Sequence, residues 1–377
     1  MDFEFSDEQR LLKDSVERLL GKHYGFEARR QHAQEPEGFS RTLWKQYADL
    51  GLLALPFEEQ YGGIGGGPVD TMIVMEAFGR ALVLEPYFAT VVLGGSLLRL
   101  GGSKTQRALL LPKIASGEAL MAFAHSEAQS RYNLADVATT ALKHGDGFVL
   151  NGKKTLVLHG DSADKLIVSA RLSGGRRDRT GIGLFLVDAA AKGLSRRGYA
   201  TIDGQRAAEV TLSDVSVAAK DSIGEATDAL PLIERVADIA IAAQCAEAVG
   251  AMAAMLDMTV DYLKTRKQFG VPIGNFQVLQ HGAAEMLIAL EQARSMAMLA
   301  AMTAGEENSD ERRSAIPAAK VQICNSARVV GQMATQLHGG IGMTMEYSVG
   351  HYFKRVTAIG RVFGDADHHL TMVARAG

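Results

Sequence analysis

The order of periodic patterns along the chain predicts an α+β protein, mainly α, with a small β domain between two helical regions. Helical spacing fills about the first 118 residues, short apolar runs between glycines and charges follow, and long helical spacing returns after about residue 224. Because helices and strands are segregated, a doubly wound parallel sheet is excluded. A chain of 377 residues is long enough for two or three domains. We expect them at 1–118, 119–224 and 225–377.

A capping box begins the first predicted helix. Ser6 offers a hydroxyl and Gln9 an amide three residues later, ahead of apolar residues at helical spacing from Leu11 to Leu20. The same kind of spacing predicts helices around 43–52 and 69–82. The N-terminal region is therefore expected to be helical throughout.

The middle region is predicted to contain strands and tight turns. Four short apolar runs are typical of strands, at 148–150, 156–158, 166–168 and 184–187. Asn151-Gly152 lies between the first two runs and predicts a hairpin with a type I′ turn, because both residue types tolerate positive φ. Gly174 to Asp178 predicts a second, exposed turn. Beyond this region, the spacing of apolar residues from Val249 to Leu263 indicates long helices.

Composition excludes several classes of protein. A net charge of −3 provides no positive field for nucleic acid, so no nucleic-acid partner is expected. Cys245 and Cys324 are the only cysteines and are far apart, which argues against a disulfide framework and favours a reducing cytoplasm. The acidic start, residues 1–5, lacks the features of a signal peptide. The apolar stretch 81–98 is interrupted by Glu85 and Pro86, so no membrane span is expected.

A metal site is not expected either. His368 and His369 lie close to two aspartates, but neighbouring helical residues project about 100° apart and do not face each other. We therefore interpret the pair as a solvated helix end. The other histidines have no metal-ligand spacing.

Four longer segments carry a specific pattern, and together they resemble the acyl-CoA dehydrogenase family over essentially the whole chain. Two of them are rarely found by chance in unrelated helical proteins: Tyr262 to Gly270 with the following Pro-Ile and Phe-Gln pairs, and Gln-Leu-His-Gly-Gly-Ile-Gly at 336–342. The other two are Gly51 to Gly63, and the stretch from Ser126-Glu127 through Asn-Gly-Lys-Lys to Ala163-Asp164.

The resemblance implies a helical N-terminal domain, a small β-barrel-like middle domain and a C-terminal four-helix bundle. It also implies FAD as cofactor and α,β-desaturation of an acyl-CoA thioester, in which a glutamate removes the α-proton. An electron-transfer flavoprotein is the implied electron acceptor. In this family each FAD lies between subunits of an oligomer, so that the Arg-x-x-Phe-Gly and Gln-x-x-Gly-Gly segments of a neighbour hold the pyrophosphate and adenosine.

Transferred by position, the neighbour-facing contacts are complete. The resemblance assigns the cation for the pyrophosphate to Arg266 and an apolar face to Phe269. It assigns amide hydrogen bonds to Gln277 and Gln336, and close backbone approach to Gly339 and Gly340. The flavin-holding contacts are reduced. Ser126 is present, but the loop after Glu127 lacks the family's glycine- and serine-rich turn, and Leu156 and Leu158 replace Trp-x-Thr. Leu158 offers a backbone N–H but no hydroxyl.

The catalytic base is missing at both positions that the family uses. Phe363 stands at the position of the glutamate, and Ala240 stands at the alternative position on the first bundle helix. Neither side chain titrates, and α-proton abstraction needs a base within hydrogen-bond reach. Asp365 and Asp238 lie two residues away, a rotation of about 200° on a helix, so they are weak candidates.

Three hypotheses follow. In the first, this chain is the base-lacking subunit of a heteromeric enzyme, similar to the small subunit of bacterial pimeloyl-CoA dehydrogenase, and a homologous large subunit brings the glutamate. In the second, the chain is a self-sufficient homo-oligomer with an atypical carboxylate base. In the third, it is an acyl-CoA-binding or scaffold protein without redox chemistry, because a fold does not fix a function. The sequence does not identify the acyl group.

Overall fold

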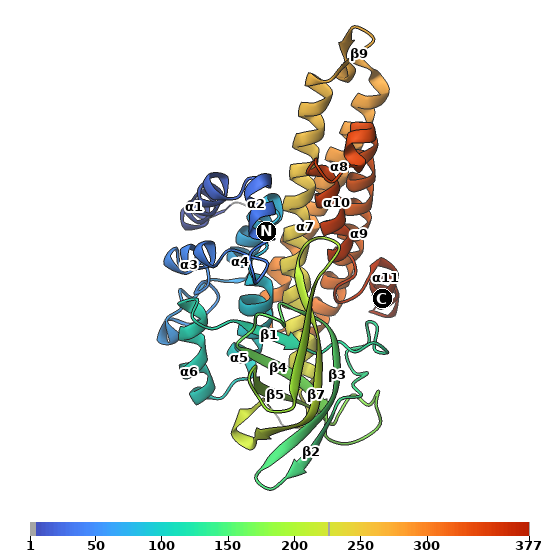
Figure 1. The fold of residues 1–377 in the computed structure, drawn as a ribbon. Coiled ribbons are helices and arrows are strands. Elements are labelled where there is room, and N and C mark those ends of the chain that lie inside the picture. The colour runs from blue at the N-terminus through green and yellow to red at the C-terminus, as the bar shows by residue number, and fades with distance from the viewer. Residues whose placement is uncertain (1–4, 225–226, 377) are drawn as a thin grey trace. The chain divides into compact units, whose positions relative to one another are not determined.

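The computed structural model describes residues 5–224 and 227–376, and Figure 1 shows their fold. Residues 1–4, which carry most of the prediction about the acidic start, lie outside the described residues. The helices are α1 Asp7–His23, α2 Phe26–His32, α3 Arg41–Asp49, α4 Pro68–Ala81, α5 Ser96–Gly101, α6 Lys104–Ala115, α7 Leu230–Thr265, α8 Gln277–Gly305, α9 Ser309–His338, α10 Val349–Ile359 and α11 Ala366–Ala376.

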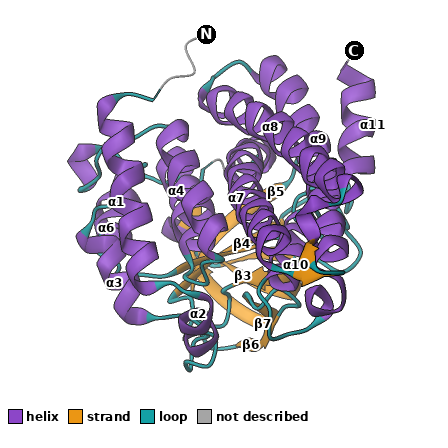
Figure 2. Cartoon of the chain, turned by 90° about the horizontal axis from the view of Figure 1, so that it is seen from above, coloured by secondary structure: helices purple, strands orange, loops and turns teal. Residues whose placement is uncertain are grey.

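Eight strands of the described chain belong to the main sheet. They are β1 Met121–Ala124, β2 Thr140–His144, β3 Gly147–Leu158, β4 Lys165–Arg171, β5 Ile182–Asp188, β6 Leu194–Ala200, β7 Arg206–Ala218 and β8 Ser222–Ile223. A separate two-residue pair consists of β9 Lys267–Gln268 and β10 Val271–Pro272. The fold class is confirmed, because the protein is mostly helical and its main sheet comes from the middle of the chain (Figure 2).

The N-terminal helix begins as predicted. The Ser6 hydroxyl accepts a hydrogen bond from the Gln9 backbone N–H, and the Gln9 side chain accepts one from the Ser6 N–H. The two bonds satisfy backbone donors that a helix start otherwise leaves without partners. The helices expected around 43–52 and 69–82 are present as α3 and α4.

The main sheet is mixed. Its strands follow the order β6-β7-β3-β2-β4-β5-β8, and β1 pairs in parallel with β4. Small and branched apolar side chains fill one face, including Leu150, Val168 and Phe185, which are fully buried. Because successive side chains of a strand point to opposite faces, the neighbours of these residues form a second face. Ser169, the neighbour of Val168 on β4, lies on this second face.

The predicted hairpin at Asn151-Gly152 is wrong. β3 continues through both residues, and the sheet register shifts there, between Leu150 and Gly152. A Cβ on Gly152 would lie 2.4 Å from the Thr139 hydroxyl, so glycine here permits a bulge and a close approach rather than a turn. The hairpin turns earlier, at Gly145-Asp146, where β2 passes into β3. The exposed turn predicted from Gly174 to Asp178 is confirmed.

The chain forms two compact units, which we describe separately. One contains residues 1–31, 68–83 and 241–377, and the other contains 32–67 and 84–240. In the first unit, α4 packs tightly against α7, since a Cβ on Gly79 would lie 1.8 Å from the Glu247 carbonyl oxygen. The second unit contains the main sheet with α3, α5 and α6.

One helix of the described chain, α7, is long and apolar enough to cross a membrane. In the most apolar 18-residue stretch of this helix, 94% is buried inside the protein. The core helix of a globular protein has this property. Cys245 on this helix and Cys324 on α9 are free thiols.

Candidate functional site

The residues predicted to face a neighbouring subunit gather at one end of the long helices. α7 ends at Thr265, α8 begins at Gln277 and α9 ends at His338, and the His338 ring stacks on the Tyr262 ring with 4.6 Å between centroids. We call this end the bundle tip, defined by residues 262–280 and 336–345. All six predicted residues at the bundle tip are exposed: Arg266, Phe269, Gln277, Gln336, Gly339 and Gly340.

The bundle tip holds Phe269 in an unusual backbone conformation. Phe269 and Gly270 connect β9 to β10 with φ values of 54° and 83°, as in a type I′ turn. Positive φ is unfavourable for a residue with a bulky side chain. The ring is nevertheless 90% exposed, and within residues 5–224 and 227–376 the edge of Phe276 is its one aromatic contact. A strained position that displays an apolar ring to the outside suggests a binding role.

The glycines of the bundle tip leave room for a ligand. A Cβ built on Gly339 or Gly340 would meet no atom within 4 Å. Gly339 ends α9 with φ 63° and ψ −141°, a region that is essentially restricted to glycine. Close approach of a backbone to a phosphate group needs this combination of open space and missing side chain.

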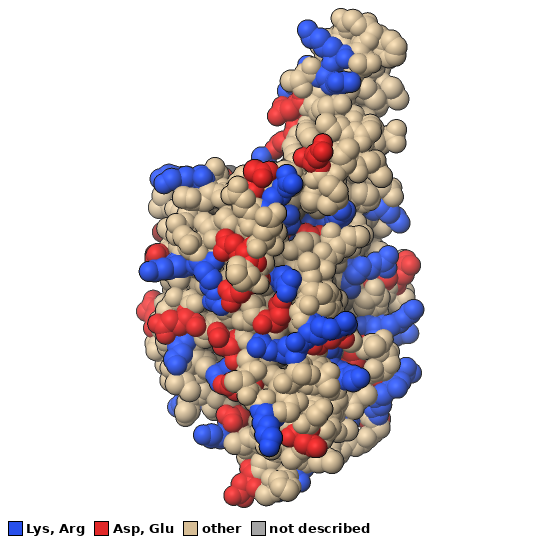
Figure 3. Space-filling view, in the orientation of Figure 1, with Lys and Arg blue, Asp and Glu red and all other residues tan. Residues whose placement is uncertain are grey.

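Positive charge is concentrated at the bundle tip. Lys264, Arg266 and Lys267 are all exposed, and Figure 3 shows Lys and Arg side chains at this end of the helices. A guanidinium keeps its charge at any physiological pH and matches the geometry of phosphate oxygens. The cation, the open glycines and the apolar ring therefore fit a dinucleotide.

The predicted flavin contacts of the middle domain lie where β1 ends and β3 bulges. The Thr155 N–H donates to the Ser126 carbonyl oxygen at 2.8 Å, which joins the two segments. The sheet register shifts between Lys154 and Val157, and Leu156 has φ 50° and is 44% exposed. Leu158 is half-buried at the end of β3. The structure thus brings Ser126 and the Leu156 to Leu158 stretch together within this unit.

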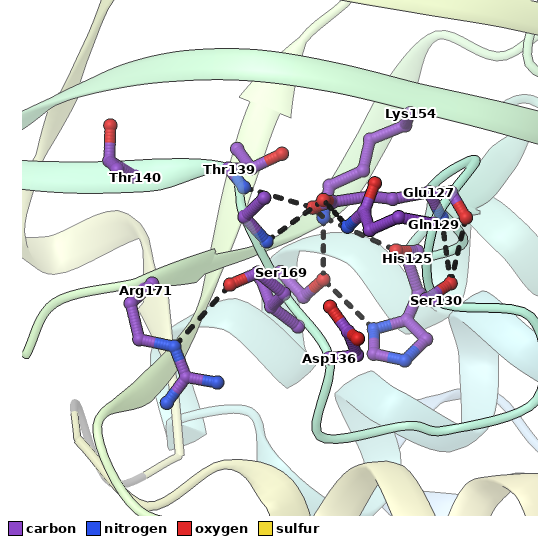
Figure 4. A network of polar contacts seen from close by, with 12 residues as sticks. His125, Glu127, Gln129, Ser130, Asp136, Thr139, Thr140, Lys154, Ser169 and Arg171 are labelled. Atoms are coloured by element: carbon purple, nitrogen blue, oxygen red, sulfur yellow. Dashed lines mark hydrogen bonds and ion pairs between the residues drawn. The ribbon is translucent and has the colours of Figure 1, made fainter. Parts of the chain in front are cut away.

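A buried ion pair supports this part of the sheet (Figure 4). The Lys154 ammonium is fully buried and lies 2.7 Å from Oε1 of Glu127. Glu127 also accepts hydrogen bonds from the backbone N–H groups of Ala138 and Thr139 and from the Gln129 amide. The carboxylate therefore closes the loop between β1 and β2 onto β3.

The protonation states of the pair follow from these contacts. Burial alone raises the pKa of Glu127, but the charge of Lys154 and the hydrogen bonds outweigh burial and lower the pKa to about 2. Burial lowers the pKa of Lys154 to about 8, against the opposing charge of Glu127. Both groups are charged at neutral pH.

Sequence reasoning missed this pair as a functional unit. Both residues lie in the segment that carries the family resemblance, but neither was assigned a role. A lysine within a strand that is otherwise apolar was the available signal, because lysine is rarely fully buried without a partner. The fold places Lys154 and Glu127 together although they are 27 residues apart, with the Thr155 N–H bonded to the Ser126 carbonyl oxygen beside them.

Both positions expected for a catalytic glutamate are structural here. Ala240 is fully buried on α7. Phe363 packs against the core of the bundle, has φ 56°, and its carbonyl oxygen lies 2.9 Å from Nε2 of His369. The last contact corrects the prediction of a solvated helix end, because His369 is only 2% exposed.

The neighbouring carboxylates have other roles. Asp365 caps α11 by accepting a hydrogen bond from the His368 N–H at 3.0 Å, and its second oxygen pairs with Arg361 at 2.9 Å. Asp238 lies half-buried on α7. Each buried carboxylate of the described chain has a hydrogen-bond donor: Glu85, Glu127, Asp136, Asp203 and Glu247.

Comparison with known proteins identifies the family. Three family models match successive parts of the chain: the acyl-CoA dehydrogenase N-terminal domain over residues 6–118, the middle domain over 122–215 and the C-terminal domain over 234–377. The chain belongs to the acyl-CoA dehydrogenase family.

Individual relatives agree with this identification. The probable acyl-CoA dehydrogenase YngJ of Bacillus subtilis is 31% identical, over 93% of this chain and 92% of that protein. The caffeyl-CoA reductase-Etf complex subunit CarC of Acetobacterium woodii is 26% identical over 93% of both. A variant of the Tcur3481-Tcur3483 steroid ACAD has a similar structure, with a TM-score of 0.88 and 29% identity over 98% of this chain and 97% of that chain.

As an acyl-CoA dehydrogenase, the protein is an FAD-dependent oxidoreductase of acyl-CoA thioesters. The isoalloxazine ring of FAD supplies hydride acceptance when the cofactor is bound. The donors and open glycines of the bundle tip fit its pyrophosphate and adenosine. A contact of the ring with Ser126 and the backbone around Leu158 stays a prediction; the structure shows Ser126 bonded to Thr155 of β3.

Proposed function

We propose that this chain is the base-lacking subunit of a heteromeric acyl-CoA dehydrogenase. Its bundle tip completes the FAD site of a homologous partner, and that partner supplies the glutamate that removes the α-proton. One contrast carries the proposal: the residues for a neighbour's cofactor are complete and exposed, whereas Phe363 and Ala240 occupy both glutamate positions.

The chemistry of α-proton removal supports this division of labour. A general base must reach the proton within hydrogen-bond distance and must be unprotonated at the working pH. The phenyl ring of Phe363 and the methyl group of Ala240 cannot accept a proton. Asp365 is engaged by Arg361 and by the helix that it caps. The chain can therefore hold and orient the cofactor, and another polypeptide has to provide the base.

The relatives favour partners of two kinds. The name of the steroid ACAD joins two different chains, Tcur3481 and Tcur3483, which favours a heteromeric arrangement here. The CarC subunit belongs to a complex with Etf, which favours an electron-transfer flavoprotein as electron acceptor. Within this proposal, the small subunit of bacterial pimeloyl-CoA dehydrogenase is the model for this chain, and the acyl group is open to test with thioesters of different length.

Flavin counting in the assembled complex tests the proposal. The chain is co-expressed with a homologue that carries the glutamate, and the FAD content per complex is measured by absorbance after purification. Arg266→Glu should lower the FAD content, because it replaces the cation that faces the pyrophosphate. Arg313→Glu, the same charge change at an exposed arginine of α9 outside the bundle tip, is the matched control and should have a much smaller effect.

The outcomes distinguish the hypotheses. Loss of FAD with Arg266→Glu but not with Arg313→Glu supports the proposed role of the bundle tip. Equal FAD content in both variants contradicts it. Reduction of flavin by acyl-CoA in the purified chain alone would instead favour a self-sufficient enzyme.

A further inference from the structure

A second buried polar group stands beside the Lys154 to Glu127 pair. His125 directly follows β1 and precedes Ser126, and it is 7% exposed. Its Nδ1 lies 2.9 Å from the Ser169 hydroxyl, and its ring stacks on Phe123 with 5.3 Å between centroids and 12° between the planes. Figure 4 shows one ring nitrogen directed at Ser169 and the other directed away from the cluster.

Counting protons fixes the tautomer of this imidazole. The Lys154 ammonium has three protons and three acceptors: Glu127 Oε1 at 2.7 Å, the Ser169 hydroxyl at 3.0 Å and the His125 carbonyl oxygen at 3.2 Å. The Ser169 oxygen therefore accepts from lysine, and Nδ1 of His125 is the acceptor that the described residues offer to the Ser169 proton. Because Nδ1 accepts this proton, the imidazole carries its hydrogen on Nε2.

The Nε2–H group lacks an acceptor within the described part of the chain. The residue as a whole is 7% exposed, and Nε2 is the part of the ring that reaches the surface of the described chain. A donor at such a surface can be satisfied by water or by a bound molecule. The stack on Phe123 and the bond to Ser169 prevent the ring from turning toward another acceptor. The Nε2–H group therefore points in one fixed direction at the surface, where a bound molecule can accept its hydrogen bond.

We propose that His125 donates a hydrogen bond from Nε2 to the isoalloxazine ring of FAD held by this chain's own middle domain. The inference rests on the proposed contact of the flavin with Ser126, the next residue. Flavin carbonyl oxygens and unprotonated ring nitrogens accept hydrogen bonds, and such bonds tune the electronics of the ring. His125 would supply a donor on the surface where Leu158 offers no hydroxyl.

The charge state of His125 suits this role. Burial, and next the charge of Lys154, lower the pKa of the imidazole to about 3, although Glu127 opposes the shift. The ring therefore stays neutral over the physiological range. It donates one hydrogen bond without adding a positive charge to the site.

Two variants separate donation to FAD from structural support by Ser169. The amide of glutamine reaches the position of Nε2, whereas the shorter asparagine places its amide at the position of Nδ1. His125→Gln keeps the outward donor and loses the Ser169 contact. His125→Asn keeps the Ser169 contact and loses the outward donor. Flavin-free protein, as the full chain and in its complex, is titrated with FAD and followed by visible absorption.

The order of the two dissociation constants decides the inference. We expect His125→Asn to raise the Kd for FAD about tenfold and to shift the flavin spectrum, and His125→Gln to remain within about threefold of the wild type. The reverse order, or unchanged Kd and spectrum in both variants, would overturn the inference. Failure of the proposed function has a different signature, because it appears as insensitivity of FAD content to Arg266→Glu.

A measurement on the wild type covers the case in which both variants misfold. Long-range ¹H–¹⁵N spectra of histidine-labelled protein identify which ring nitrogen of His125 carries the proton, with and without FAD. We expect the proton on Nε2, and a shift of this nitrogen when FAD binds. A proton on Nδ1, or an Nε2 signal that does not respond to FAD, contradicts the inference.

Discussion

Replacing Lys154 by methionine tests the buried ion pair of the middle domain. Methionine fills a similar volume but removes the ammonium that lies 2.7 Å from Glu127. The carboxylate would keep its three N–H donors from Gln129, Ala138 and Thr139 but would be a buried charge without a counter-charge. Removing one partner of a buried pair is strongly destabilising for this reason.

The pKa of Glu127 gives the magnitude. Lowering this pKa from 4.5 to about 2 corresponds to about 3 kcal/mol of stability at neutral pH, because one pKa unit equals about 1.4 kcal/mol. Since the folded pKa is depressed, this stability is present above pH 4.5 and is lost as the pH falls through about 2. We expect Lys154→Met to lower the free energy of unfolding at pH 7 by about 3 kcal/mol.

Urea denaturation at pH 7 measures the effect, with Lys165→Met as the matched control. Lys165 forms an ion pair of similar length with Asp188, 3.0 Å, but both side chains are solvated, at 30% and 58% exposure. The control should lose less than about 1 kcal/mol. The double variant Glu127→Gln with Lys154→Met should recover part of the loss, because the unpaired charge is gone. If Lys154→Met were no worse than Lys165→Met, the reasoning would be refuted.

Three other predictions concern the bundle. Burial, and then the charges of Lys320 and His368, lower the pKa of His369 to about 4. Because the imidazole of the unfolded chain is protonated at a higher pH than that of the folded chain, the free energy of unfolding should fall by about 3 kcal/mol between pH 6.5 and 4. Urea titrations of His369→Gln should show a smaller fall, and a dependence of stability on pH equal to that of the wild type would contradict this. Asp365→Ala should lower the free energy of unfolding by about 1 kcal/mol, because α11 loses its cap. The turnover of the complex should stay at the wild-type level. Loss of turnover in a folded variant would instead identify Asp365 as the base that removes the α-proton. Phe269→Ala should change stability by less than about 0.5 kcal/mol but should lower the FAD content of the complex, and unchanged FAD content would exclude a binding role for the exposed ring.

Local patterns predicted most of the fold. The capping box at Ser6 and the helical spacing of α3 and α4 depend on residues within one or two turns, so the sequence contains the whole signal. The Asn151-Gly152 hairpin failed because the decisive contact is not local. Thr139 fills the space in which a side chain at position 152 would lie, so the glycine serves strand packing. The positive-φ turn occurs instead at Phe269-Gly270, where phenylalanine gives no turn signal.

The candidate site divides in the same way. The exposed residues of the bundle tip belong to short linear segments, and the family resemblance was enough to select them. The network of His125, Glu127, Lys154 and Ser169 was not predictable from spacing, because three strands bring its members together. The burial of His369 depends in the same way on packing against residues distant in sequence. Sequence periodicity does not report such contacts.

The central claim is that the base belongs to another polypeptide. Anaerobic addition of acyl-CoA thioesters to the FAD-loaded protein, monitored by loss of flavin absorbance, tests this claim most directly. We predict no bleaching in the purified chain and rapid bleaching in its complex with the glutamate-bearing homologue, abolished when that glutamate is replaced by glutamine. Rapid bleaching of the chain alone, or bleaching that survives the replacement in the partner, would contradict the account.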